Sequence, residues 1–135
     1  MDRTLTYPHL RRAALGTALV FFVSGSLLGT WVSRLPATRD RLHASPAELG
    51  LALLAPGIGS LISMPTAGWL CRRFGSRTVV AATALPCMAF LVLLAVAPSL
   101  PTVAGALLLW GLVYGTWDVA MNVQGSGVEK SAGRA

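Results

Sequence analysis

The chain has 135 residues, of which 54% are hydrophobic and only 12% are charged, and its formal net charge is +6. Soluble domains carry charge on roughly a quarter of their residues, so this composition excludes an ordinary soluble domain and indicates a membrane protein. The basic residues come in small groups between apolar runs, without a continuous stripe or interleaved aromatic residues, which argues against nucleic-acid binding.

Four apolar stretches follow one another along the chain, and short polar segments separate them. The stretches are residues 13–34, 46–70, 78–97 and 102–124. Each is long enough, at a helical rise of about 1.5 Å per residue, to cross a hydrocarbon core about 30 Å thick. A soluble bundle needs a polar face on each helix, whereas charge is missing from nearly all of these positions. The sequence therefore predicts an all-α integral membrane protein with four transmembrane helices, between tails at residues 1–12 and 125–135.

Local signals mark where these helices begin, end and bend. The segment 45–48, Ser-Pro-Ala-Glu, combines an N-cap serine, a proline at the first helical position and a glutamate at the third, which predicts a capping box. Residues 125–127, Gly-Ser-Gly, can close the fourth helix. Kinks are expected at Pro56, Pro65 and Pro86, which lie inside the apolar stretches.

The lysines and arginines predict how the helices cross the membrane. If the N-terminus is cytoplasmic, eight basic residues fall inside and three outside, so the positive-inside rule predicts that both termini are cytoplasmic. The inside group is Arg3, Arg11, Arg12, Arg72, Arg73, Arg77, Lys130 and Arg134, and the outside group is Arg34, Arg39 and Arg41.

Small residues at helical spacing indicate where the helices pack. Lipid tails are as apolar as leucine, so close backbone approach at small residues is what holds helices together in a membrane. A chain rich in alanine and glycine also produces such spacings by chance, and the sequence leaves both explanations open. The small residues are Gly25 and Gly29 in the first helix, Ala52, Pro56, Gly59 or Ser60, Ser63 and Ala67 in the second, and Gly111 and Gly115 in the fourth.

The fourth stretch contains an acidic residue, Asp118. Placing an aspartate at mid-membrane costs roughly 2.5–3.5 kcal/mol, and the eight leucines and valines of this stretch, at roughly 0.3–0.6 kcal/mol each, offset that cost with little surplus. We therefore expect the carboxylate to face the bundle or a wet cavity. Asn122 lies one turn further on the same face, and Gln124 is rotated to the side. The alternative is an aspartate hydrated near the cytoplasmic surface, which helps only topology.

Arg34 is the obvious candidate partner for Asp118, but the two lie at different depths. Arg34 ends the first stretch at the outer face, most of a membrane thickness from Asp118, so a direct ion pair is not expected. Arg34 is instead expected to reach outward to water or to line the outer mouth of a cavity.

The loop between the second and third helices, "GWLCRRFGSR", resembles the short glycine-and-arginine loop of the major facilitator superfamily, whose pattern is G-x-L-x-D-R-x-G-R-R. The usual aspartate is replaced by Arg72 and one arginine by Ser76, so the carboxylate that joins a charge network at the inner gate is absent. The matching residues are Gly68, Leu70, Arg73, Gly75 and Arg77.

The pair Asp118 and Asn122, followed by a glycine, is similar to the fourth helix of the fucose-permease-like branch of that superfamily, a group of bacterial inner-membrane carriers. The resemblance implies that the acid takes part in proton coupling. Carriers of this type often place a second acid in the first helix, and residues 13–32 contain none. Transport is therefore expected, and proton coupling is left open.

The resemblance implies a twelve-helix fold in two similar halves, with the solute held between them. This chain would be an N-terminal fragment, working with the missing C-terminal part or as a homo-oligomer, in the cell inner membrane. It would move a small polar solute, sugar-like by resemblance alone, by alternating access, with a proton as a further partner. First and fourth helices line the cavity in this family. The implied binding residues are Asp118, Asn122, Gln124, Trp31 and Arg34, and the implied cytoplasmic gate is Gly68, Arg72, Arg73, Gly75 and Arg77.

Two other functions stay open: a standalone four-helix exporter that works as a homo-oligomer, and a non-transporting or truncated membrane protein. An enzyme is not expected, because the sequence shows no metal-ligand cluster, no nucleophile with a base and no phosphate-binding glycine loop. No metal or cofactor is therefore predicted. Cys71 and Cys87 fall at different depths, which argues against a disulfide.

Overall fold

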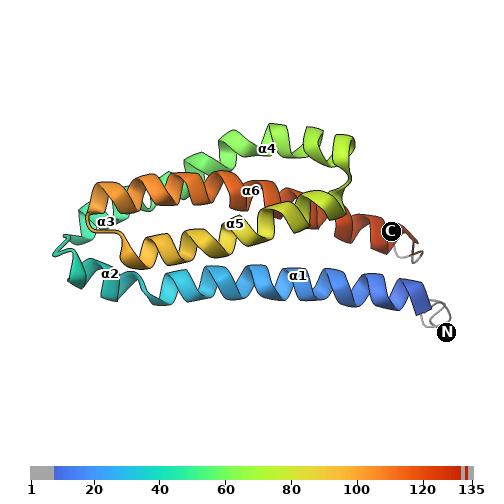
Figure 1. The fold of residues 1–135 in the computed structure, drawn as a ribbon, viewed down its shortest axis with the longest axis horizontal. Coiled ribbons are helices and arrows are strands. Elements are labelled where there is room, and N and C mark those ends of the chain that lie inside the picture. Colours follow the sequence, from blue (N-terminus) through green and yellow to red (C-terminus); the bar gives the residue numbers. More distant parts are fainter. Residues whose placement is uncertain (1–7, 132, 134–135) are drawn as a thin grey trace.

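The computed structural model describes residues 8–131 and 133, and in that part of the chain it is built from helices (Figure 1). Four helical spans are long and apolar enough to cross a membrane: His9–Arg41, Pro46–Phe74, Ser76–Val96 and Leu100–Ser131. The prediction of an all-α protein with four membrane helices is confirmed. The helices are α1 (Pro8–Ser33), α2 (Leu35–Arg41), α3 (Pro46–Ala52), α4 (Leu54–Phe74), α5 (Ser76–Val96) and α6 (Leu100–Ser131).

Two of the spans are interrupted, and a proline accounts for each interruption. The first breaks between α1 and α2 at Arg34, because Pro36 has no N–H to donate to the carbonyl one turn earlier. The second breaks between α3 and α4 at Leu53, three residues before Pro56. The bend expected at Pro56 thus takes the form of a break, whereas Pro65 and Pro86 lie inside continuous helices.

The capping box at the start of α3 is confirmed. The backbone N–H of Glu48 donates to Ser45 Oγ at 3.2 Å, and the backbone N–H of Ser45 donates to Glu48 Oε2 at 2.8 Å. Each residue thus satisfies a donor that the first turn of a helix leaves without a partner.

α6 continues to Ser131, past the glycines at 125 and 127 where the sequence indicated an end. A Cβ at Gly125 would lie 3.6 Å from the Phe21 ring, so this glycine packs against α1 as part of the helix. The positive φ of 70° falls at Gly133, whose N–H donates to the Lys130 carbonyl at 3.1 Å. The glycine that closes α6 is therefore Gly133.

α6 lies at the centre of the bundle and packs against α4, α5 and α1; in the view of Figure 1, α4 lies on one side of it and α5 and α1 on the other. Its contact with α4 is the closest: a Cβ on Gly111 would overlap the carbonyl of Pro56, and one on Gly115 would lie 2.7 Å from the Cα of Ser60. The packing role of the α6 glycine pair is confirmed. By contrast, a Cβ on Gly25 or Gly29 of α1 would meet no atom of the described chain within 4 Å.

The start of α1 and the end of α6 lie at the same end of the bundle, which is called the terminal end below (Figure 1). At the opposite end, Arg41 ties α2 to α5. Its Nη1 donates to the Ala97 carbonyl at 2.9 Å and its Nη2 to the Leu94 carbonyl at 3.4 Å. A cation there satisfies the last carbonyls of α5 and complements the negative end of its dipole.

Candidate functional site

Asp118 and Asn122 lie one turn apart on α6, toward the terminal end. Asp118 is half-buried and Asn122 is exposed. Both line a cavity of about 550 Å³, together with Ser126 and Lys130. Asn122 Nδ2 donates to the backbone carbonyl of Asp118 at 2.8 Å, which leaves the amide oxygen of Asn122 to accept. The structure therefore brings together the two residues that the sequence placed on one face.

The carboxylate of Asp118 has no counter-charge at ion-pair distance within residues 8–131. The one ion pair in that range joins Arg39 Nη2 to Asp40 Oδ1 at 3.0 Å on the surface. Every described residue that lines the cavity beside Asp118 belongs to α6, so the carboxylate lies on an open face of that helix.

A second cavity, of about 450 Å³, adjoins the first and lies between α1 and α6. Asn122 and Ser126 line both cavities, so the two form a continuous polar stretch along α6. Thr17 of α1 and Glu129 of α6 complete the second cavity. The sequence reasoning missed Glu129 because it ended the helix at the glycines 125 and 127. Had the helix been extended past these glycines, the spacing of four and seven residues from Asn122 to Ser126 and Glu129 would have placed all three side chains on one face.

Gln124 faces a different cavity, of about 920 Å³, between α1 and α5. Arg12, Arg77 and Trp117 also line this cavity. The amide oxygen of Gln124 is buried and has no hydrogen-bond partner in the described chain. Gln124 is thus separated from Asp118 and Asn122 by the width of α6, as its rotation along the helix requires.

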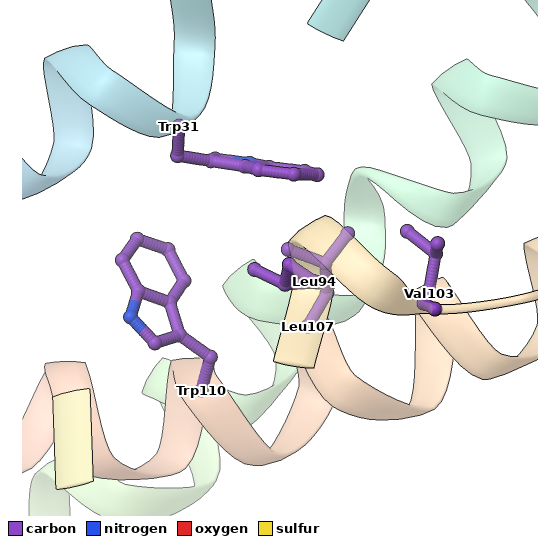
Figure 2. Packing of buried hydrophobic residues seen from close by; sticks show 6 residues of the cluster. Trp31, Leu94, Val103, Leu107 and Trp110 are labelled. Carbon is purple, nitrogen blue, oxygen red and sulfur yellow. The ribbon is translucent and has the colours of Figure 1, made fainter. Parts of the chain in front are cut away.

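Trp31 and Arg34 line a cavity of about 420 Å³ at the opposite end of the bundle, against α5. Trp31 is only 4% exposed, and its ring packs with Trp110, Leu94 and Leu107 (Figure 2). Most of the indole is therefore committed to the core. The predicted binding residues fall into three cavities: Asp118 with Asn122, Gln124 apart, and Trp31 with Arg34.

The middle of the bundle contains a polar contact that sequence reasoning missed. Ser24 Oγ and the Tyr114 hydroxyl lie 2.9 Å apart and join α1 to α6. Ser24 is 2% exposed, and the Tyr114 ring packs against Trp110 in a tilted arrangement at a centroid distance of 4.7 Å and edge-on against Trp117 at 6.1 Å. A lone serine in an apolar helix gives no sequence signal for its partner, since that partner comes from a helix ninety residues away.

The predicted gate loop forms the tight connection between α4 and α5 at the terminal end. Gly75 has φ 82°, a conformation that favours glycine, and its N–H donates to the Cys71 carbonyl at 3.0 Å. Arg72 and Arg73 are exposed in the last turn of α4, where cations complement the helix dipole. Arg77 follows in the first turn of α5. Gly68 lies within α4, and a Cβ there would make only ordinary contact, at 3.6 Å, with Arg72 Nη1.

These features define a multi-pass helical membrane protein with polar cavities along its central helix. Residues 7–126 match the Major Facilitator Superfamily, and the chain belongs to that superfamily of membrane transporters. No solved structure matches the chain.

Three relatives illustrate the family, and the chain spans about a third of their length. An uncharacterized transporter of Sinorhizobium fredii, y4wD, is 42% identical over 119 residues, which are 88% of this chain and 32% of that protein. An uncharacterized MFS-type transporter of Yersinia pestis is 39% identical over 121 residues, 90% of this chain and 32% of the relative. The membrane protein MosC of Rhizobium meliloti is 32% identical over 126 residues, 93% of this chain and 31% of the relative.

Proposed function

We propose that this chain is the N-terminal part of a secondary active transporter that moves a small polar solute by alternating access. The observation that carries the proposal is the half-buried carboxylate of Asp118, beside Asn122 and without an ion-pair partner in the described chain, in an open cavity on the central helix. An intramembrane acid marks a solute or proton pathway by default, because its insertion cost is not repaid by packing.

Two further observations support transport, one from the structure and one from the relatives. α1 and α6, the helices that line the cavity in the resembling family, share a polar cavity at the terminal end. The relatives at 39% and 42% identity are named as transporters. The finer assignments rest on resemblance alone: the fucose-permease-like branch, a sugar-like solute and proton symport.

We assign the terminal end to the cytoplasm of a cell inner membrane. The assignment follows the positive-inside rule, because exposed arginines gather at this end. Since the relatives are about three times as long, the rest of the carrier would come from further helices of the same polypeptide or from further copies of this chain. The arginines are Arg11, Arg12, Arg72, Arg73 and Arg77.

The mass of the native product in membranes tests the assignment to a larger carrier. An N-terminal tag should detect a band several times larger than 14.1 kDa. A band at 14.1 kDa that sizes as a homo-oligomer and exports solute would favour the standalone exporter. The same band without transport activity would favour a non-transporting membrane protein.

The role of Asp118 is tested by pairing Asp118→Asn with Asp118→Ala in solute uptake measured together with proton movement. If the carboxyl binds and releases a proton, both variants should stop proton-driven uptake. Should Asp118→Asn keep proton-driven uptake while Asp118→Ala loses it, protonation is ruled out and hydrogen bonding to the solute remains. Counterflow of unlabelled against labelled solute, which needs no proton step, separates lost coupling from lost binding.

A further inference from the structure

α1 separates two cavities of opposite charge in the terminal half of the bundle. On one side lies the groove lined by Thr17, Asn122, Ser126 and Glu129, and Glu129 is its one charged lining residue among those that the structure describes. On the other side lies the cavity lined by Arg12 and Arg77. Neighbouring residues of α1 face the two: Thr17 lines the acidic groove and Gly16 lines the basic cavity.

Thr17 is a buried polar group that nothing in the described chain satisfies. It is 9% exposed, and its Oγ1 is buried without a hydrogen-bond partner. A helical threonine usually donates to the carbonyl one turn earlier, as Thr116 Oγ1 does to Leu112 at 2.9 Å. Thr17 makes no such bond, and a buried hydroxyl without a partner is costly. Thr17 therefore leaves an unsatisfied hydroxyl in the wall of the groove.

The other polar groups of the groove both donate and accept, and their one full charge is negative. Asn122 uses one of its two amide N–H groups on the Asp118 carbonyl and keeps the other N–H and the amide oxygen. The Ser126 hydroxyl can donate or accept, and the Glu129 carboxylate can only accept. The adjoining cavity adds the carboxylate of Asp118 and the ammonium of Lys130. Among the described residues, no arginine or lysine lines the groove itself. Such a set can hydrogen-bond hydroxyl and ammonium groups, and its negative charge repels carboxylates and phosphates.

We propose that the groove of Thr17, Asn122, Ser126 and Glu129 is a water-filled subsite that takes hydroxyl or ammonium groups and rejects anions. This inference rests on the proposed function in placing the groove on the solute's path. It makes Glu129 a second acidic residue of the site, on the extension of α6, and it restricts the solute to a neutral hydroxylated or cationic compound.

The charge preference of the groove is measured by thiol modification and needs no transport assay. The background carries Cys71→Ser and Cys87→Ala, with any cysteine in further helices of the polypeptide also replaced, so that a cysteine introduced at Thr17 or at Gly16 is the single thiol. Gly16→Cys is the matched control, because a Cβ at Gly16 meets no atom within 4 Å and the position lines the basic cavity. Unsealed membranes containing each variant react with a cationic and an anionic methanethiosulfonate, and each rate is divided by that of a free thiol.

Thr17→Cys should react with the cationic reagent roughly five-fold faster than with the anionic one after this correction, as expected for one nearby charge in a wet site. Adding Glu129→Gln should remove most of that preference. Gly16→Cys should show no cationic preference, and Glu129→Gln should leave its rates unchanged. This pattern supports the subsite.

Two results would overturn it. A Thr17→Cys thiol that reacts with neither reagent, while Gly16→Cys reacts, would show that the groove is dry. Equal corrected rates, or a preference that survives Glu129→Gln, would remove the charge argument. If Thr17→Cys fails to accumulate, Ser126→Cys reports the same groove from α6, where that side chain is exposed.

The outcome is separable from that of the proposed function. Loss of the labelling pattern with intact uptake would reject the groove and keep the transporter. An intact labelling pattern in a protein that moves no solute would keep the groove and reject the transporter.

Discussion

At Gly59, Gly111 and Gly115 the lack of a side chain lets α4 and α6 touch through their backbones. The Pro56 carbonyl occupies the place where a Cβ on Gly111 would lie, and a Cβ on Gly59 would overlap the carbonyl of Leu108. A flexible side chain could rotate away from such an overlap, but backbone cannot. The glycine spacing is therefore a steric requirement of this helix pair.

Gly111→Ala is expected to lower the free energy of unfolding by about 1–3 kcal/mol, because the added methyl group must push α4 away from α6. Gly105→Ala is the matched control in the same helix, since a Cβ there meets no atom within 4 Å. Unfolding of the purified protein in detergent, followed by circular dichroism, measures both. Equal stability of the two variants would contradict the backbone contact.

At the level of elements, apolar length and capping chemistry predicted the helices well. The four spans need only uninterrupted apolar residues, and the capping box at Ser45 needs only local contacts, so both are visible in the sequence. The end of α6 was not predictable in this way. The glycine at 125 indicates a helix end by its local preference, but its contact with Phe21 on α1 is a tertiary interaction. Glu129 was missed for the same reason.

The extension of α6 can be tested with Gly127→Ala. Inside a helix, alanine is more favourable than glycine by about 1 kcal/mol, and a Cβ at this position meets nothing within 4 Å, so the variant should be more stable. Gly75→Ala should destabilise the protein instead, by about 1–2 kcal/mol, because φ is 82° there. The same detergent unfolding assay reads out both variants. A Gly127→Ala protein with unchanged stability would favour an irregular tail.

Among the four spans, the one that contains α1 is the least buried by the rest of the protein and α6 is the most buried. In an apolar stretch of 18 residues within each span, 6% of the residues are buried in the first span, which contains α1, and 44% are buried in α6. The Ser24–Tyr114 contact and the packing of Trp31 hold α1 in place. The sequence could not predict which helix would be central, because all four are apolar and their coverage is decided by neighbours far away in the chain.

This difference predicts that α1 is the least protected of the long helices. In detergent, the backbone amides of α1 around Ser24 should exchange with deuterium faster than those of α6 around Gly111, because local opening is easiest where few contacts must break. Mass-spectrometric measurement of peptides from both helices checks this. A Ser24→Ala variant should speed exchange in α1 further and leave the centre of α6 nearly unchanged. Equal protection of the two helices would contradict the loose attachment of α1.

The central position of α6 also bears on how the protein is made. α6 is the span with the lowest mean hydropathy, 1.4 against 2.5 for α5, and it contains the costly Asp118. It is also the last of the described helices to be synthesised. α4 and α5 precede α6 in the chain, so we expect the helix that partitions least readily into lipid to enter the bilayer against helices that are already made. On this expectation the order of synthesis is also the order of assembly.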